Sequence, residues 1–324
     1  MILDAHGHVG TWPDFLIPHP TAEHLVAAMD RIGVTAMGIS HLLAVGPDAV
    51  RGNELAMGIA ERFPGRFGVW QVYNPHHRTP LVTDGVWGVK LHPDVHQCRL
   101  DDPLYDPVWA LGLPVLAHGQ TDSLWSDPAL FAAVAARHPE VRLIMGHTGL
   151  WPYGFSRAAR LVADHPNVFL ETCGSRITGR WIARLAALAG AERVVFGSDA
   201  CFLDLRTGYG RVALAPLSDD DRDLVQGGNL ARLLGLPSPP ARPPPPEPPP
   251  PGPPPPRLPI PRPPMPGPRR DPFRDARHPR GTPVRTAPGP PGRRPSTPRS
   301  ASSSPRCWRA ASGAPRRAVP SSRT

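Results

Sequence analysis

The fold is constrained most by eight short β-rich runs that alternate with amphipathic helical patterns through residues 1–236. Alternation of this kind predicts a parallel sheet whose strands are joined by right-handed crossovers. Eight strands within about 250 residues are typical of a closed (β/α)8 TIM barrel of the α/β class. An open doubly wound sheet is the alternative, but no GxGxxG sequence follows the first strand to indicate a nucleotide site.

The segments can be assigned from apolar periodicity. The expected strands are Ile2–Ala5, Val34–Ser40, Arg66–Tyr73, Val86–Leu91, Pro114–Ala117, Val141–Gly146, Asn167–Glu171 and Arg193–Gly197. The expected helices are Ala22–Ile32, Asn53–Phe63, Pro128–Arg137, Ser156–Ala163, Arg180–Ala189 and a closing helix over Asp219–Leu234.

The composition of the chain changes at residue 236. Residues 237–324 contain 32 of the 48 prolines, including the runs Pro243–Pro246 and Pro253–Pro256. Proline donates no backbone hydrogen bond, and this region has too little apolar surface to offset the entropy of ordering. We therefore expect a barrel domain over residues 1–236 and a disordered Pro/Arg-rich tail over residues 237–324.

The charge divides at the same place. The tail has a net charge of +14 and residues 1–236 have a net charge of −5, which gives +9 for the whole chain. The basic excess that would indicate nucleic-acid binding therefore lies in the tail. No repeat or interleaved aromatic pattern there supports specific recognition, so nucleic acid is not an expected partner. A non-catalytic nucleic-acid-binding protein that acts through the tail remains an alternative function.

The cysteines and the apolar runs indicate the compartment. Cys98, Cys173, Cys201 and Cys307 show no CxxC spacing, as expected of reduced thiols in the cytosol. The sequence contains no secretory signal pattern and no run of 18 apolar residues. We therefore expect a cytoplasmic protein without membrane contact, and homo-oligomerisation is left open.

Polar side chains stand at or just beyond the carboxyl ends of the expected strands. In chain order they are His6, His8, His41, Asn74, Lys90, His92, His118, His147, Glu171 and Asp199. TIM-barrel enzymes build their active sites at this end of the barrel. His6 and His8 lie two residues apart, so they share one face of the first strand and can offer two nitrogens to one metal ion.

Short motifs surround these residues. They are Asp4-Ala5-His6-Gly7-His8, Gly88-Val89-Lys90-Leu91-His92-Pro93, Leu116-Ala117-His118, Met145-Gly146-His147-Thr148-Gly149, Phe196-Gly197-Ser198-Asp199 and the closing segment Asn229–Leu236. Together they resemble the amidohydrolase superfamily, and in particular the amidohydrolase-related branch that includes aminocarboxymuconate semialdehyde decarboxylase-like enzymes. The likeness spans residues 1–236 and does not include the tail.

The resemblance implies that His6, His8, His118 and Asp199 bind one divalent metal ion, preferably Zn²⁺. Three imidazoles and a carboxylate are a ligand set that suits zinc. The resemblance also implies catalytic roles for Asp199, which would accept a proton from water, and for His147. His147 would orient that water, stabilise an oxyanion or act as a further metal ligand, and for Asp199 a helix N-cap is the structural alternative.

Lys90 is the only lysine in the chain, against 35 arginines. Binuclear members of the superfamily carry a carboxylated lysine at the end of the fourth strand. In the branch resembled here one metal is usual, which implies that Lys90 faces a substrate carboxylate. A structural salt bridge is the alternative role for this lysine. His92 is expected to line the substrate site beside it.

The expected function is that of a metal-dependent hydrolase. Its substrate would be a small molecule that bears a carboxylate and an ester, lactone or amide bond. The same branch also performs metal-dependent, non-oxidative decarboxylation of small unsaturated or aromatic acids with the same histidine and aspartate. A decarboxylase is therefore the first alternative.

Overall fold

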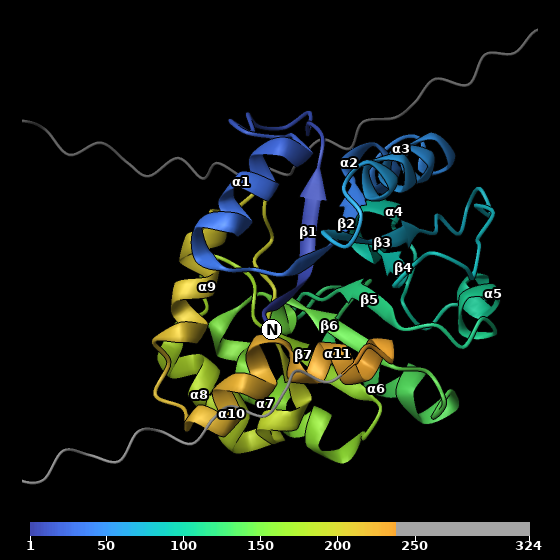
Figure 1. Ribbon diagram of the computed structural model, residues 1–324. Coiled ribbons are helices and arrows are strands. Elements are labelled where there is room, and N and C mark those ends of the chain that lie inside the picture. Colours follow the sequence, from blue (N-terminus) through green and yellow to red (C-terminus); the bar gives the residue numbers. More distant parts are fainter. Residues whose placement is uncertain (238–324) are drawn as a thin grey trace, which may run out of the picture. The chain divides into compact units, whose positions relative to one another are not determined.

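The computed structural model describes residues 1–237 as a ring of eight parallel strands with helices outside it (Figure 1). The strands are β1 (Leu3–Val9), β2 (Ala36–His41), β3 (Phe67–Val72), β4 (Gly88–Leu91), β5 (Val115–His118), β6 (Leu143–Gly146), β7 (Val168–Glu171) and β8 (Val194–Val195). Each strand from β1 to β7 pairs in parallel with the next strand along the chain. The expected strand order is confirmed.

Backbone hydrogen bonds between β1 and the segment that follows β8 close the ring. The Ala5 N–H donates to the Phe196 carbonyl at 2.8 Å, and the Asp199 N–H donates to the His6 carbonyl at 2.7 Å. Because these bonds join the first strand to the segment directly after the last strand, the closed TIM barrel is confirmed and the open sheet is wrong.

The helices agree with the sequence where strong caps are present. The longer ones are α1 (Ala22–Ile32), α3 (Ala49–Arg62), α6 (Pro128–Arg137), α7 (Pro152–Asp164), α8 (Gly179–Ala189) and α9 (Leu205–Ala213). The bounds of α1 and α6 are those expected. For α1 the reason is local: the Thr21 hydroxyl accepts from the His24 N–H, and Gly33 ends the helix in a left-handed conformation. Helix α9 was not predicted.

The strand–helix alternation is incomplete in the middle of the chain. No helix joins β3 to β4, and the β4–β5 connection has only the short turns α4 (Pro93–His96), η1 (Pro103–Tyr105) and α5 (Asp106–Trp109). Repeated prolines in these two connections explain the lack of long helices. The other short helices are α2 (Leu42–Val45), η2 (His147–Gly149) and η3 (Ala191–Arg193).

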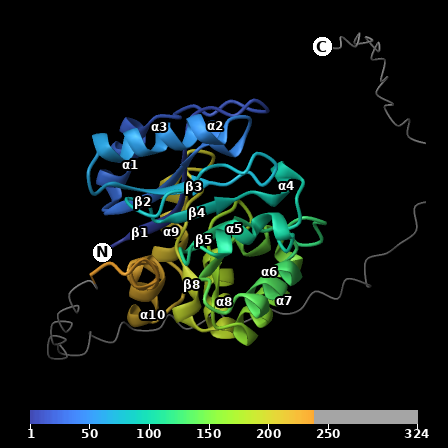
Figure 2. The ribbon, with the colours of Figure 1, turned by 90° about the vertical axis from the view of Figure 1, so that its right-hand side faces the viewer.

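The closing helix is present but contains a wider turn. It comprises α10 (Asp219–Asp223), the π-helical turn η4 (Leu224–Gly228) and α11 (Asn229–Leu234). Within that turn the Val225 carbonyl accepts a hydrogen bond from the Phe196 N–H at 2.9 Å. The turn η4 and helix α11 contact β1 near its start, at the opposite end of the barrel from the strand carboxyl ends (Figures 1 and 2).

The barrel interior is a packed core rather than a pore, as in other TIM barrels. Leu3, Trp70, Leu116, Ile144 and Phe169 form one buried cluster with residues of α11. This apolar layer forms the floor beneath the polar residues at the carboxyl ends of the strands.

Some expectations fall outside the described residues. The disordered tail and the nucleic-acid alternative both concern residues 238–324, which the structure does not describe. Within residues 1–237, none of the helices has the length and apolar character needed to cross a membrane. Cys98, Cys173 and Cys201 form no disulfide bond.

Candidate metal centre and its cavity

A cavity of about 530 Å³ opens at the carboxyl ends of the strands. A volume in this range suits a small-molecule ligand. The polar side chains that line it are His6, His8, Lys90, His92, His118, His147, Arg176 and Asp199. The apolar side chains are Trp12, Phe15, Leu42, Val45, Leu150, Phe202 and Leu203. The cavity therefore contains every residue that the sequence singled out as a ligand, catalytic or substrate-binding residue.

The two histidines of the first motif are directed by an irregularity in β1. Between Asp4 and Gly7, three steps along β1 match two steps along β2. An extra residue of this kind bends a strand and re-aims its side chains. A Cβ atom on Gly7 would collide with the Met37 side chain, so glycine allows β1 and β2 to approach closely between His6 and His8.

His6, His8 and Asp199 form a compact group of donors. Asp199 Oδ1 lies 3.4 Å from His8 Nε2 and 3.8 Å from His6 Nε2. Two donors bound to one tetrahedral zinc ion at roughly 2.0–2.2 Å are separated by about 3.4 Å. The spacing and the chemistry of these three donors therefore fit a divalent ion such as zinc.

Hydrogen bonds on the other ring nitrogens leave the Nε2 atoms to the cavity. His6 Nδ1 lies 3.0 Å from Glu171 Oε2, and His8 Nδ1 lies 3.0 Å from the Ser40 hydroxyl. Metal-binding histidines commonly make this kind of contact through the nitrogen that does not bind the metal. Both rings are thus held with Nε2 directed toward Asp199.

Burial sets the protonation states of these donors. It lowers the pKa of His6 and of His8, so both imidazoles are neutral. Burial by itself would raise the pKa of Asp199, but a hydrogen bond from His8 and the neighbouring histidines outweigh it and hold that pKa below its ordinary value. Neutral imidazoles and an ionised carboxylate are the forms that bind a metal.

Two candidate residues have an unusual backbone. Asp199 has φ 63° and His147 has φ 58°, in the left-handed region that non-glycine residues seldom adopt. Nearby hydrogen bonds hold both: the Asp199 N–H donates to the His6 carbonyl, and the His147 N–H donates to Glu171 Oε2 at 3.0 Å. No helix begins at Asp199, since α9 is capped by Asp204. The N-cap alternative for Asp199 is therefore wrong.

Lys90 lies beside the donor group. Its Nζ is 2.7 Å from His6 Nε2, and burial lowers its pKa to about 8. No carboxylate of residues 1–237 lies within 4.0 Å of Nζ, so the salt-bridge alternative is not observed there. The lone pair on His6 Nε2 cannot serve both an ammonium group and a metal ion. A bound metal would therefore require Lys90 to turn toward the open cavity.

His118 lies in the same cavity but outside the compact donor group. Its ring stacks on His92, with the ring centroids 4.2 Å apart, and lies 4.8 Å from the His147 ring. Its Nε2 is 3.9 Å from Asp94 Oδ2. Burial lowers the pKa of His118 to about 4, so this imidazole is also a neutral donor.

The family model for amidohydrolases matches residues 3–236. The chain belongs to the amidohydrolase family. This confirms the resemblance found in the sequence. No curated sequence matches the chain significantly.

Solved structures of similar fold include decarboxylases and amidohydrolases, and two of those described here have a bound metal ion. A 5-carboxyvanillate decarboxylase from Sphingomonas paucimobilis is 15% identical, with a TM-score of 0.56 over 72% of this chain and 99% of that one. A dihydroxybenzoic acid decarboxylase from a Polaromonas species, with manganese and 2-nitroresorcinol bound, is 18% identical, with a TM-score of 0.57 over 72% and 96%. An amidohydrolase from Burkholderia multivorans with bound zinc is 17% identical, with a TM-score of 0.55 over 73% and 100%. At these identities the likeness shows the fold.

Two buried residues beside the candidate site, Cys173 and Asp4, were not expected from the sequence to contribute to it. Cys173 was expected only to be a reduced thiol, yet its buried sulfur lies 2.9 Å from His147 Nδ1. Asp4 is also buried, and its Oδ1 accepts from the N–H groups of His6 and Ser198, each at 3.0 Å. Burial raises the pKa of Asp4 to about 7. The motif contained Asp4, but nothing in the sequence showed that it ties β1 to the segment after β8.

Besides Glu171, two strand-end residues do not line the cavity. The His41 ring accepts from the Leu43 N–H and caps α2. Asn74 is buried in the turn after β3, where its N–H donates to the Thr79 hydroxyl at 3.1 Å. Both residues stabilise loops that leave the barrel.

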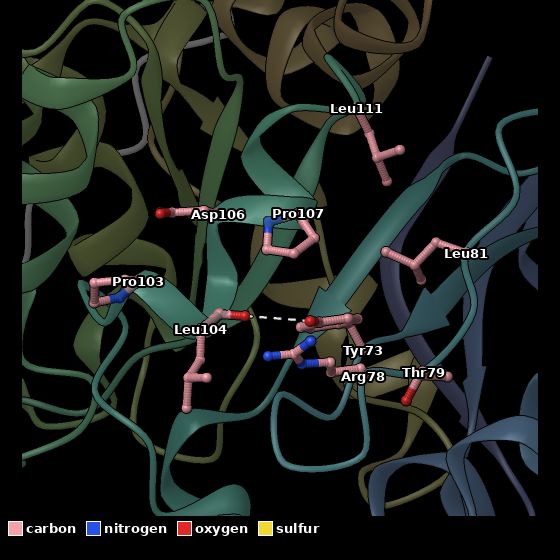
Figure 3. Close-up of a pocket in the computed structure, with 9 residues that line it drawn as sticks. All are labelled: Tyr73, Arg78, Thr79, Leu81, Pro103, Leu104, Asp106, Pro107 and Leu111. Atoms are coloured by element: carbon pink, nitrogen blue, oxygen red, sulfur yellow. Dashed lines mark hydrogen bonds between the residues drawn. The ribbon is translucent and has the colours of Figure 1, made fainter.

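A second cavity, of about 480 Å³, lies between the loop after β3 and the η1–α5 segment (Figure 3). In it the Tyr73 hydroxyl donates to the Leu104 carbonyl at 3.2 Å. Its other lining residues are Arg78, Thr79, Leu81, Pro103, Asp106, Pro107 and Leu111. None of the candidate ligands or catalytic residues belongs to it, so the proposed chemistry is assigned to the cavity at the strand ends.

His96 follows His92 by four residues but does not line the cavity and is buried, with 6% of its surface exposed. Its Nε2 donates to the Val45 carbonyl at 3.1 Å, and its Nδ1 has no partner within residues 1–237. Protonation would therefore place an N–H on Nδ1 without an acceptor. Burial lowers the pKa of His96 to about 4.

We expect His96 to make the fold less stable in acid. Below pH 6.5 the unfolded chain binds a proton at this residue that the folded chain does not bind until pH 4, so the free energy of unfolding falls through that window. The contribution is up to about 3 kcal/mol, at 1.36 kcal/mol for each pKa unit. Between pH 7.5 and pH 5, urea unfolding should show a smaller loss in the free energy of unfolding for His96→Gln than for the wild type. The exposed His77→Gln variant should behave like the wild type, and an equal loss in all three proteins would contradict this prediction.

Proposed function

We propose that this protein is a metal-dependent hydrolase that acts on an ester, lactone or amide bond of a small, carboxylate-bearing substrate. The observation that carries the proposal is the content of one cavity: the donor group of His6, His8 and Asp199 lies next to the Lys90 ammonium group. We include His118 as the fourth ligand, since its neutral ring lines the same cavity. A zinc or similar ion held there would supply a Lewis acid at the reacting group.

The protein's own residues provide the proton transfers. Asp199 is held ionised at its position beside His8, so it can accept the proton of an attacking water molecule. His147 lines the cavity with its Nδ1 turned toward Cys173, which leaves Nε2 for a hydrogen bond to that water or to the developing oxyanion. Burial excludes bulk water from this polar cluster and strengthens its electrostatic interactions.

The remaining lining residues indicate a compact acid as substrate. Lys90 offers a buried cation, and Arg176 offers a second one at the rim, where its guanidinium lies 4.1 Å from the centre of the Trp151 ring. Within residues 1–237, Arg176 has no ion-pair partner. Trp12 and Phe202 supply apolar walls. Two cations and an apolar wall suit a molecule with a carboxylate on a hydrocarbon or aromatic body.

Decarboxylation is the second candidate function. The same cations and apolar walls would hold an aromatic acid, and the solved structures of similar fold include decarboxylases that act on such acids. A panel of esters, lactones, amides and small aromatic acids, tested with the zinc- and manganese-loaded full chain, distinguishes the two. Acid release without CO₂ supports hydrolysis, and CO₂ release alone supports decarboxylation. If no compound releases either an acid or CO₂, both candidate functions are contradicted.

Substitution of Lys90 tests the substrate class. With a carboxylate-bearing substrate, Lys90→Met should raise KM about 10- to 100-fold and leave kcat nearly unchanged, because a charge-assisted hydrogen bond contributes roughly 1.5–3 kcal/mol. The matched control is a substrate analogue in which an amide replaces the carboxylate, for which KM should not change. An equal rise in KM for both compounds would contradict a carboxylate-binding role.

A further inference from the structure

Behind the cavity, two side chains at the end of β7 contact two of the candidate histidines. Glu171 and Cys173 are buried and belong neither to the compact donor group nor to the cavity lining. We propose that they are positioning residues that fix which ring nitrogen of His6 and of His147 carries the proton, leaving both Nε2 atoms unprotonated toward the cavity. The roles of those Nε2 atoms in metal binding and catalysis rest on the proposed function, but the assignment of the tautomers does not.

Glu171 acts as an acceptor for several donors at once. Oε2 lies 3.0 Å from His6 Nδ1 and accepts the His147 N–H at 3.0 Å, while Oε1 accepts the Cys173 N–H. Because backbone N–H groups already occupy both oxygens as acceptors, the carboxylate form satisfies the contacts best. His6 must then donate from Nδ1. Its Nε2 consequently carries a lone pair toward Asp199.

Cys173 extends the same constraint to His147. Its sulfur lies 2.8 Å from Glu171 Oε2, to which it donates, and 2.9 Å from His147 Nδ1. A thiol has one proton, and when it is given to Glu171 the sulfur can only accept from His147. His147 is therefore protonated on Nδ1. The chain of contacts runs from a carboxylate through a thiol to an imidazole.

This assignment narrows the role of His147. A ring with a lone pair on Nε2 can accept a hydrogen bond from a water molecule, but it cannot donate one to an oxyanion. Of the functions considered for His147, the contacts with Cys173 favour orientation of the attacking water. Because Nδ1 of His6 and Nδ1 of His147 both carry a proton, Glu171 and Cys173 affect the metal centre only indirectly, through the two rings.

A second metal site is the competing use of these atoms. His6, His147, Glu171 and Cys173 each offer one ligand atom, and these atoms all lie within 4.8 Å of one another. However, Cys173 Sγ is 2.9 Å from His147 Nδ1 and 3.3 Å from His6 Nδ1. Sulfur and nitrogen bound to one tetrahedral zinc ion would be about 3.6 Å apart. Both separations are shorter than a shared zinc ion would give, so we assign the cluster to positioning.

Nitrogen-15 NMR of the metal-free full chain, labelled at histidine, tests the tautomers directly. Signals are assigned from His6→Gln and His147→Gln. In the wild type both residues should be protonated on Nδ1. Cys173→Ser should keep the His147 tautomer, because a hydroxyl can replace the thiol, whereas Cys173→Ala should move the His147 proton to Nε2. Cys98→Ala removes another buried thiol and should change neither signal.

Zinc affinity, measured by competition with a chelator, provides the second readout. Glu171→Gln should weaken zinc binding about 10- to 100-fold, as expected when a partner of a metal-binding histidine is lost. Cys173→Ala should change it by less than about threefold and keep the zinc stoichiometry. A wild-type His147 protonated on Nε2, an unchanged His147 tautomer in Cys173→Ala, or a second zinc ion lost from that variant would each overturn the proposal. A wild type with the expected tautomers but no zinc would instead refute the metal centre.

Discussion

Replacing Asp199 with asparagine should remove most of the bound zinc and lower turnover by roughly 10²–10⁴-fold. The change keeps the volume of the side chain but removes the negative charge that lies 3.4 Å from His8 Nε2. It also removes the group that we propose accepts the proton from water. Zinc per chain, measured by elemental analysis after reconstitution and desalting, should fall from about one equivalent. Circular dichroism should show that the barrel remains folded.

Asp204→Asn is the matched control for this experiment. Asp204 lies in the same connection between β8 and α9 but is exposed and pairs with Arg206. This variant should hold zinc and turn over like the wild type. If Asp199→Asn retains a full equivalent of zinc, Asp199 is not a ligand, and if it retains turnover, Asp199 is not the proton acceptor.

Replacing His147 with alanine should lower kcat by roughly 10²–10⁴-fold while the zinc content stays at one equivalent. The reason is position: His147 lines the cavity, but its Nδ1 faces Cys173 and its ring lies 5.1 Å from the His6 ring, beside the compact donor group. Single-turnover and steady-state rates with the best compound of the panel provide the measurement. Loss of zinc from this variant would make His147 a ligand instead.

Added imidazole gives a control within the same variant. A small base that enters the vacated space should restore part of the kcat of His147→Ala, and it should have no effect on the wild type. A structural role for His147 would predict no such rescue. Activity close to that of the wild type without imidazole would refute any catalytic role.

The fold could be predicted well because its signals are local. The apolar runs fixed the strand order, and Thr21 and Gly33 marked both ends of α1. Local signals also led to His6 and His8, two residues apart on β1. The structure places Asp199 within 4 Å of both rings. From the sequence, this proximity was expected only because the barrel topology gathers the carboxyl ends of the strands.

The contacts behind the histidines could not be predicted in the same way. Glu171 meets His6 across 165 residues of sequence, and no spacing rule connects them. A position near a strand end also does not show whether a residue is buried, as His96 is, or whether it lines the cavity, which His41 does not. In the wider turn at η4, the Val225 carbonyl accepts a hydrogen bond from the Phe196 N–H, another interaction between distant segments.

The single lysine has a practical consequence. Lys90 is 1% exposed, so its side chain and the adjacent backbone are out of reach of a protease while the barrel is intact. A lysine-specific endoprotease has one cleavage site in the whole chain, and amine-reactive reagents have one side-chain target. Each cut at Lys90 therefore records one opening of the barrel, whereas a small amine-reactive label can reach Nζ through the cavity. Cleavage at Lys90, the residue that we place opposite the substrate, therefore also measures how often the barrel opens around that site.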